Sequence, residues 1–331
     1  MSSSFTSVEI CAGAGGQALG LEHAGFNHAA CVELDPAAVE TLRINREDEW
    51  NIIEADVRSW SYAGTEAVDL LAGGVPCPPY SIAGRQLGAD DERDLLPEVL
   101  RRAREIGPRA LMIENVRGLL SAKFESYRAE ILEELAVLGY VGEWRLLQAS
   151  DYGVPQLRPR SILVALRPSD RVHFEWPEPV AGVPPTVGEV LLPMMSEGGW
   201  RGARAWAKTA NSIAPTLVGG SKKHGGADLG PTRAKRQWAE LGVNGLSLAD
   251  AAPERTFKGS PRLTIEMTAA LQGFPSDWIF AGRKTARYRQ VGNAFPPPVA
   301  AAVGRRIVAA FSTADSTEEI KAPTPVVAAV A

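Results

Sequence analysis

The stretch Gly-Gly-Val-Pro-Cys-Pro-Pro-Tyr-Ser places Cys77 between prolines, directly after a short apolar run. Prolines restrict the backbone, so this setting would hold the Cys77 sulfur in one position. Because a free thiol is only a few per cent thiolate at neutral pH, a nucleophilic cysteine needs a cation, a base or a helix N-terminus beside it. The competing interpretation is an inert buried cysteine, which we favour for Cys11 and Cys31 because they fall within predicted strands. The spacing of the three cysteines predicts neither a disulfide framework nor a metal site.

Groups that would assist a thiolate occur further along the chain. Glu114 and Asn115 end another apolar run, and burial beside a strand raises the pKa of a glutamic acid toward neutrality, so that it can protonate a ring nitrogen. A helix-capping or salt-bridging acid is the competing interpretation of Glu114. Gln156, Arg158 and Arg160 alternate before the run Ser-Ile-Leu-Val-Ala-Leu, so we expect all three to face one side of the strand that begins there. Guanidinium groups there would stabilise a thiolate and hydrogen-bond a carbonyl oxygen.

One reaction uses all of these groups, the methylation of a cytosine ring at C5. The ring is too electron-poor at C5 to attack a methyl donor directly, so a thiolate adds to C6 while an acid engages N3. C5 then takes the methyl group, and loss of the C5 proton with expulsion of the thiol restores the aromatic ring. In duplex DNA the base must leave the stack to reach Cys77.

A glycine cluster after the first predicted strand indicates a cofactor site. Gly13, Gly15 and Gly16 precede a predicted helix, and glycines at such a turn allow a ligand to approach the backbone closely. Glu33 ends the second strand, where a carboxylate can accept hydrogen bonds from ribose hydroxyls, and Asp56 ends the third, where an adenine amino group can donate to it. A packing turn and a dinucleotide site are the alternatives, but the spacing is not G-x-G-x-x-G and the chain holds no P-loop. S-adenosylmethionine, which carries a sulfonium and no phosphate, fits better.

Short apolar runs alternate with amphipathic segments in the first half of the chain, which predicts a doubly wound, mostly parallel α/β sheet of the Rossmann-like type. Ligands of such sheets bind at the carboxyl ends of the strands. The predicted strands cover residues 7–11, 28–34, 51–56, 68–74, 109–114 and 161–166, and the predicted helices 15–26, 36–45, 96–107 and 125–140. A further helix is predicted to end at Gly273, and a last one to follow the prolines at 296–298.

The amino-acid composition changes near residue 180, where loop-like segments contain proline, glycine, aromatic and basic residues. Residues 201–236 hold eight lysines and arginines against one acid, a local excess that suits a polyanion although the whole chain has a net charge of −4. A solvated basic loop is the alternative. The predicted organisation is a catalytic and cofactor-binding domain over 1–180 completed by a helix region over 288–312, a second, smaller loop-rich domain over 181–287, and a disordered tail over 313–331.

The composition excludes several classes of protein. With 331 residues, 45% of them hydrophobic, the chain can bury a full core. It has neither the pattern of a signal peptide nor the roughly 18 uninterrupted apolar residues of a membrane helix. We therefore expect a monomeric cytoplasmic protein with no membrane partner.

Taken in order, the motifs resemble those of the DNA (cytosine-5) methyltransferase family of bacterial type. The matching segments span nearly the whole chain and are EICAGAGG, VELD, EADV, GGVPCPPYS, IENV, QLRPR, LQGFP and RQVGNAFPPPV. The resemblance implies that Cys77 is the nucleophile and Glu114 engages N3, while Arg158 and Arg160 support the site and Asn115 shapes it. It also implies S-adenosyl-L-methionine as the cofactor, double-stranded DNA as the partner, and a cognate restriction endonuclease that acts separately.

The resemblance also assigns binding positions. Those implied to contact the cofactor are Cys11, Ala12, Gly13, Gly15, Gly16, Glu33, Leu34, Asp56, Val57, Leu96, Asn293 and Ala294. The resemblance and the local excess of basic charge together give the residues expected to contact DNA, which are Ser81, Arg85, Gln86, Gln156, Thr216, Leu217, Lys222, Lys223, Arg233 and Arg236. Region 181–287 would then be the target recognition domain, and Thr216-Leu217 resembles its recurrent Thr-Leu pair.

The chain departs from the family pattern at three positions. Cys11 stands where the family usually has a phenylalanine stacked on adenine, Pro78 replaces a common glutamine and Ala294 a common serine. None of these removes a group that the chemistry requires. Three alternatives remain. The first is an exocyclic-amine methylase, since Cys-Pro-Pro-Tyr resembles the Asn-Pro-Pro-Tyr motif of such enzymes. The others are a tRNA-methylating branch of the family, whose Cys-Phe-Thr signature is absent here, and a catalytically silent DNA-binding homologue.

Overall fold

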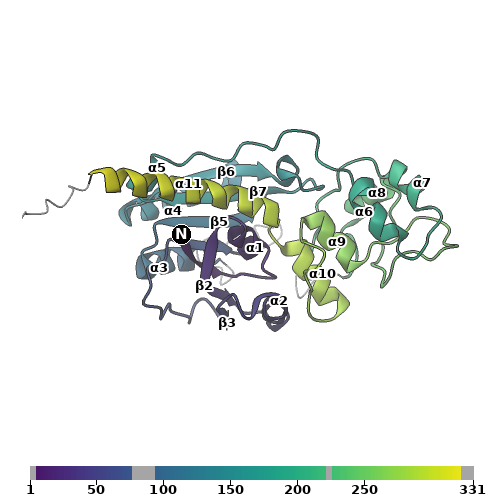
Figure 1. Cartoon of the computed structure of the whole chain (residues 1–331), viewed down its shortest axis with the longest axis horizontal. Coiled ribbons are helices and arrows are strands. Elements are labelled where there is room, and N and C mark those ends of the chain that lie inside the picture. The colour runs from purple at the N-terminus through teal and green to yellow at the C-terminus, as the bar shows by residue number, and fades with distance from the viewer. Residues whose placement is uncertain (1–4, 77–93, 221–225, 322–331) are drawn as a thin grey trace, which may run out of the picture.

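A seven-stranded sheet covered by helices on both faces forms the larger part of the molecule (Figure 1). The structure, a computed structural model, describes residues 5–76, 94–220 and 226–321, with side chains as far as residue 317. The strands are β1 (Phe5–Ile10), β2 (Phe26–Glu33), β3 (Ile52–Glu54), β4 (Leu70–Gly74), β5 (Ala110–Val116), β6 (Val141–Gln148) and β7 (Pro159–Leu166).

The strand order is β3-β2-β1-β4-β5-β7-β6. Strands β1 to β5 are parallel, and β7 runs antiparallel between β5 and β6. The prediction of a doubly wound, mostly parallel sheet is confirmed. Strand β6 was not predicted, because its burial does not follow the alternation of a half-buried strand: Val141 and Leu146 are exposed and only Leu147 is buried.

Helices cover the two faces of the sheet through alternate residues of its central strands. On one face, Ala72 and Met112 pack with side chains of α1 (Gly16–Glu22) and α11 (Pro297–Lys321). On the other face, Leu71 and Leu111 pack with α3 (Leu96–Ile106) and α4 (Glu125–Val137). Two further helices of this part are α2 (Pro36–Arg46) and the short α5 (Pro168–Arg171).

Residues 187–293 form a second body of short helices, named here the helical lobe (Figure 1). Its helices are α6 (Val187–Ser196), α7 (Ala203–Thr209), α8 (Thr232–Glu240), α9 (Ile265–Gln272) and α10 (Lys284–Asn293). Helix α9 ends at Gly273 as predicted, since Gly273 adopts the left-handed conformation with a φ of 86°. The helical lobe thus has more regular structure than its loop-like composition predicts.

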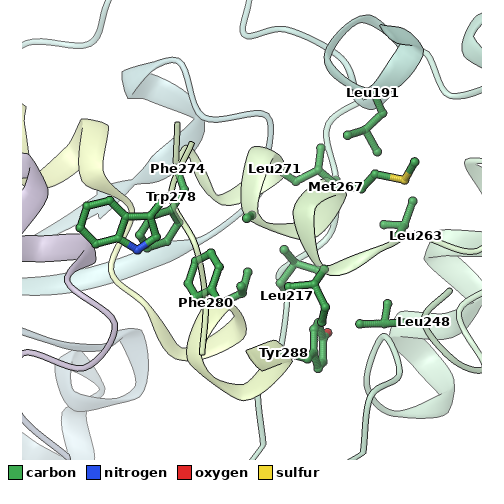
Figure 2. Close-up of a cluster of buried hydrophobic side chains, with 14 of the residues drawn as sticks. Leu191, Leu217, Leu248, Leu263, Met267, Leu271, Phe274, Trp278, Phe280 and Tyr288 are labelled. Atoms are coloured by element: carbon green, nitrogen blue, oxygen red, sulfur yellow. The ribbon is translucent and has the colours of Figure 1, made fainter. Parts of the chain in front are cut away.

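The core of the helical lobe continues into the sheet-bearing part of the molecule. Figure 2 shows the cluster extending from Trp278 and Phe274 through Leu271 to Leu191 and Leu263. The same cluster includes residues of the glycine turn, of α1 and of α2, namely Ala12, Ala14, Leu19 and Leu42. A hydrogen bond from the Trp278 indole to the carbonyl oxygen of Ala14, at 3.2 Å, fixes this junction. The boundary of the predicted recognition domain at 181–287 therefore stays a prediction.

The end of the chain corrects one expectation. Residues 313–331 were predicted to be disordered, but α11 continues to Lys321. The reason is tertiary: Ala314 is buried, and the Asp315 carboxylate lies 2.8 Å from the guanidinium of Arg109. Residues 322–331 lie outside the described residues. Within the described ranges, no helix has the combination of length and apolar character needed to cross a membrane.

A buried histidine makes the fold sensitive to acid. In β2, the His28 ring has Nδ1 at 2.8 Å from the Ser7 hydroxyl and Nε2 at 2.9 Å from the carbonyl oxygen of Ala18. Burial lowers the pKa of His28 to about 4, below the value of about 6.5 in an unfolded chain. The unfolded state therefore binds more protons between these values, so stability is full above about pH 6.5 and is lost as the pH falls toward 4.

We predict that His28→Gln makes the free energy of unfolding less dependent on pH, because the glutamine side chain does not titrate. Between pH 7 and 4.5, the wild-type protein should lose roughly 2 kcal/mol more unfolding free energy than the variant. Urea unfolding at a series of pH values measures the difference. If the free energy of unfolding changed equally with pH in the two proteins, His28 would not be the cause of the acid sensitivity.

Candidate active site

A cavity of about 600 Å³ opens where the carboxyl ends of β1, β2 and β4 meet. This is the edge at which ligands of doubly wound sheets bind. Ten of the predicted cofactor positions line it, namely Cys11, Ala12, Gly13, Gly16, Glu33, Leu34, Asp56, Val57, Asn293 and Ala294. Glu114 and Pro76 line the same cavity, so the space for a cofactor reaches the place predicted for the reacting base.

Two predicted cofactor positions do not line the cavity. Leu96, the first residue of α3, is buried in the core, and its neighbour Leu95 lines the cavity instead. A Cβ atom on Gly15 would lie 2.8 Å from the Leu42 side chain and 2.9 Å from that of Trp278. The absence of a side chain at Gly15 therefore allows the glycine turn to pack closely against Leu42 and Trp278.

Glu33 holds the glycine turn in place. One carboxylate oxygen accepts a hydrogen bond from the backbone N–H of Gly13 at 2.7 Å, and the other accepts from Leu34 and Asp35 at 2.8 and 2.7 Å. Gly13 has a φ of 56°, and a Cβ atom built on it would meet nothing within 4 Å. The Glu33 carboxylate is thus oriented before any ligand arrives, and Gly13 leaves the cavity open above it.

Asp56 and Cys11 form another part of the cavity wall. Hydrogen bonds from Arg58 lower the pKa of Asp56, and the two side chains form an ion pair at 2.5 Å. Burial raises the pKa of the Cys11 thiol, and the carboxylates of Glu33 and Asp56 raise it further. Cys11 therefore remains a neutral thiol. It does not lie within a strand as predicted, because β1 ends at Ile10, and it lines the cavity half-buried.

Glu114 lies at the end of β5 in a buried ion pair. Its Oε1 lies 2.5 Å from Nε of Arg160. Burial raises the pKa of the Glu114 carboxyl, although Arg160 and Arg158 both act to lower it. A carboxyl group whose pKa is raised holds a proton more readily and can donate it, or a hydrogen bond, to a bound base. Glu114 forms a salt bridge and is also suited to act as a general acid, so the two interpretations of this residue are compatible.

Asn115 fixes the strand that leads to Cys77. Its Nδ2 donates to the carbonyl oxygen of Val75 at 3.1 Å, and its Oδ1 accepts from the backbone N–H of Val116 at 2.8 Å. Asn115 therefore ties the ends of β4 and β5 together immediately before Pro76. Cys77 itself lies outside the described residues, as do Ser81, Arg85, Gln86, Lys222 and Lys223.

The hydrogen bonds of Arg158 go to backbone carbonyl oxygens, while its charge also acts on Glu114. Its guanidinium is fully buried and donates to the carbonyl oxygens of Leu217 at 2.8 Å, Gly292 at 2.8 Å and Ala294 at 2.9 Å. Strand β7 begins only at Pro159, so the strand alternation assumed for the three polar residues does not extend back to Arg158. Arg158 joins the segment that contains Leu217 to the wall of the cofactor cavity.

Gln156 is also a structural residue rather than a DNA contact. It is fully buried, donates to the carbonyl oxygen of Leu271 at 3.1 Å and accepts from the backbone N–H of Leu217 at 2.9 Å. Leu217 is buried in the cluster of Figure 2, and the Thr216 hydroxyl donates to the carbonyl oxygen of Leu157. Of the described candidates for DNA contact, Arg233 and Arg236 are exposed, both on α8.

Several polar residues of the cavity were missed by the sequence analysis. They are Glu9, Gln17, Asp35, Arg58, Arg289 and Gln290. Glu9 lies within β1, two residues before Cys11, and strand periodicity could have placed it on the same face. Arg289 and Gln290 come from α10, far along the chain, and no local pattern indicates them. Among the described residues, no group of three His, Cys, Asp or Glu side chains is placed to hold a metal ion.

Comparison with known proteins identifies the family. The family model for C-5 cytosine-specific DNA methylases matches residues 5–309. The chain belongs to this family. It is 60% identical over 311 residues to the type II methyltransferase M.NaeI of Lentzea aerocolonigenes, covering 92% of this chain and 75% of that protein. It is 57% identical to M.NgoMIV of Neisseria gonorrhoeae over 310 residues, which are 93% and 98% of the two chains.

Solved structures of distant relatives share the fold. The Entamoeba histolytica methyltransferase EhMeth superposes with a TM-score of 0.64 at 16% identity, over 92% of this chain and 98% of that one. A mutant of Spodoptera frugiperda DNMT2 gives a TM-score of 0.63 at 16% identity, over 92% and 100%. The chain is thus a DNA cytosine-5 methyltransferase by family, on a fold that these enzymes share.

We predict that Arg158→Met lowers the unfolding free energy by about 3–5 kcal/mol, because it leaves several buried carbonyl oxygens without a donor. Arg204→Met, at an exposed position on α7, is the matched control and should change stability by less than about 0.5 kcal/mol. Urea unfolding of the two variants measures the effect. Equally small changes in the unfolding free energy of both variants would show that the Arg158 hydrogen bonds do not stabilise the fold.

Proposed function

We propose that this enzyme transfers the methyl group of S-adenosyl-L-methionine to C5 of cytosine within a specific sequence of double-stranded DNA. The observation that carries this proposal is the position of Glu114. Its buried carboxyl, with a raised pKa, lines the same cavity as the strand-end carboxylates of Glu33 and Asp56. A proton donor for the base and a site for a nucleoside cofactor therefore share one space.

The residues of the cavity fit the cofactor. Glu33 would accept hydrogen bonds from the ribose, Asp56 would accept from the adenine amino group, and the open space above Gly13 allows close approach to the backbone. The volume of about 600 Å³ is that of a small-molecule site. When bound, the cofactor supplies an electrophilic methyl group on a sulfonium.

The remaining steps belong to the protein's own residues. The Cys77 thiolate adds to C6 of the extruded base, while Glu114 donates to N3 and so favours electron density at C5. Arg160 orients the Glu114 carboxyl through their ion pair. Asn115 acts as a positioning residue, because it holds the end of β4 from which Cys77 follows. After methyl transfer, loss of the C5 proton allows the thiol to leave.

DNA binding and biological context complete the proposal. The exposed arginines of α8, Arg233 and Arg236, together with Lys222 and Lys223 of the sequence, would contact phosphates, and region 181–287 would read the target sequence. The relatives M.NaeI and M.NgoMIV are named type II methyltransferases, which supports a modification role beside a separate restriction endonuclease. We place this activity in the cytoplasm and assign it to a monomer.

The proposal is tested by methyl transfer from labelled S-adenosyl-L-methionine to mixed-sequence duplex DNA and to tRNA, followed by mapping of the modified atoms. The expected product is 5-methylcytosine in duplex DNA at one recurring sequence. Methylation of an exocyclic amine or of tRNA alone would replace this proposal by one of the alternatives. DNA binding with no methyl transfer would indicate a silent homologue.

We predict that Glu114→Gln lowers the rate of methyl transfer by about 10²–10⁴, because the amide cannot supply a proton to N3. Binding of S-adenosylhomocysteine should stay within about threefold. The control is Glu125→Gln, at an exposed position on α4, which should retain the wild-type rate. Normal turnover by the Glu114→Gln enzyme would show that Glu114 is not the proton donor. In a separate test, a 5-fluorocytosine duplex that fails to cross-link to the wild-type enzyme would show that Cys77 is not the nucleophile.

A further inference from the structure

A long irregular segment supplies one wall of the cofactor cavity. It joins β3, which ends at Glu54, to β4, which begins at Leu70. Its first residues, from Ala55 to Arg58, line the cavity, and they include Asp56, the proposed acceptor for the adenine amino group. Because a loop is held less firmly than the strands that it connects, the position of the Asp56 carboxylate depends on what fixes this segment.

Helix α3 fixes this segment through a buried arginine. Arg102 is fully buried, although a buried guanidinium is costly unless its donors find partners. It donates from Nη2 to the carbonyl oxygen of Val57 at 2.8 Å and from Nη1 to the hydroxyl of Ser61 at 3.3 Å. Its guanidinium also lies 5.5 Å from the centre of the Trp60 ring. These three partners all belong to the segment between β3 and β4.

Two other side chains of α3 strengthen this attachment. Nη2 of Arg101 donates to the carbonyl oxygen of Arg58 at 2.7 Å, and the Glu105 carboxylate accepts from the backbone N–H of Tyr62 at 3.1 Å. Glu105 also forms an ion pair with Arg102, which balances the buried charge. The helix therefore holds the segment through both its backbone and its side chains.

The attachment bears on the cavity because it acts on the residues directly after Asp56. Val57 and Arg58 are the next two residues, and the Arg58 guanidinium donates to both carboxylate oxygens of Asp56. A hydrogen bond weakens steeply when its partners are misaligned, so a carboxylate that recognises one amino group must be held within a narrow range of positions. Helix α3 supplies this constraint from outside, since neither Arg101 nor Arg102 is among the described residues that line the cavity.

We infer that Arg102, assisted by Arg101, is a positioning residue that makes the cofactor site selective for a purine with an amino group at position 6. It does so by holding the segment after β3, and with it the Asp56 carboxylate. This inference rests on the proposed function and deepens it, because it assigns base selectivity to a residue that touches no ligand. An apolar side chain would fill the same buried position without the cost of burying a charge, so packing alone does not account for an arginine there.

The test compares two ligands that differ in the purine. Binding of S-adenosylhomocysteine and of S-inosylhomocysteine, which has a 6-oxo group in place of the 6-amino group, is measured by calorimetry on the full-length protein. The wild type should bind the inosine analogue about 10–100-fold more weakly, because the oxo group replaces a hydrogen bond to a carboxylate by a contact between two acceptors. In Arg102→Met, which keeps an unbranched side chain but no donors, this ratio should fall below about fivefold.

Arg104→Met is the matched control. Arg104 lies on the same helix with a side chain that is 59% exposed, and it pairs with Glu134 of α4, so its ratio should equal that of the wild type. If Arg102→Met does not fold, Arg101→Met decides the question, because the Arg101 side chain is 41% exposed and its loss leaves Arg102 in place. The ratio in Arg101→Met should fall about threefold, as expected for loss of a partly exposed hydrogen bond.

The outcomes separate the two proposals. A wild-type protein that binds neither ligand would overturn the proposed function. If the deciding variant keeps the wild-type ratio, only the present inference is overturned, even where the affinity for both ligands falls equally, since a purely structural role predicts that result. A wild-type protein that binds both ligands equally well would remove Asp56 from base recognition and would overturn the present inference, while methyl transfer would still be judged by its own assay.

Discussion

The buried guanidinium of Arg158 holds together segments that lie far apart in the sequence. Its hydrogen bonds reach Leu217 in the helical lobe and Gly292 and Ala294 beside the cofactor cavity. Backbone carbonyl oxygens buried in this way need donors, and one planar cation with several N–H groups satisfies three of them at once. The cavity, the helical lobe and the entrance to β7 therefore have a common anchor. Separating these segments would break hydrogen bonds of the buried guanidinium.

Opposing electrostatic effects set the character of the site. Burial raises the pKa of Glu114, and two arginines restrain the increase. On β2, three backbone N–H groups surround the Glu33 carboxylate. Two glutamates at strand ends of the same sheet thus differ in chemistry because their neighbours differ. The first is suited to proton donation, and the second is suited to accept hydrogen bonds.

The sequence predicts local structure and strand-end chemistry well, and tertiary hydrogen bonding poorly. Apolar runs located β1, β2, β3, β4, β5 and β7, and strand-end acids located the cavity, because both signals depend on residues near one another in the chain. Arg158 and Gln156 were misplaced because their partners lie at 217, 271 and 292–294, which no local pattern connects. The helical end of the chain was missed for the same reason, since Asp315 finds its partner at Arg109.

The packing of α11 against α1 has a consequence for biosynthesis. A Cβ atom on Gly20 of α1 would lie 2.4 Å from the backbone oxygen of Pro297, so the two helices are in intimate contact. One face of the sheet therefore receives part of its cover from α11, which is translated well after the strands that it covers. On the ribosome the nascent chain must carry this apolar surface uncovered until α11 has been synthesised. The wall at Asn293 also arrives late, so a truncated translation product would lack part of the cavity that the finished enzyme uses.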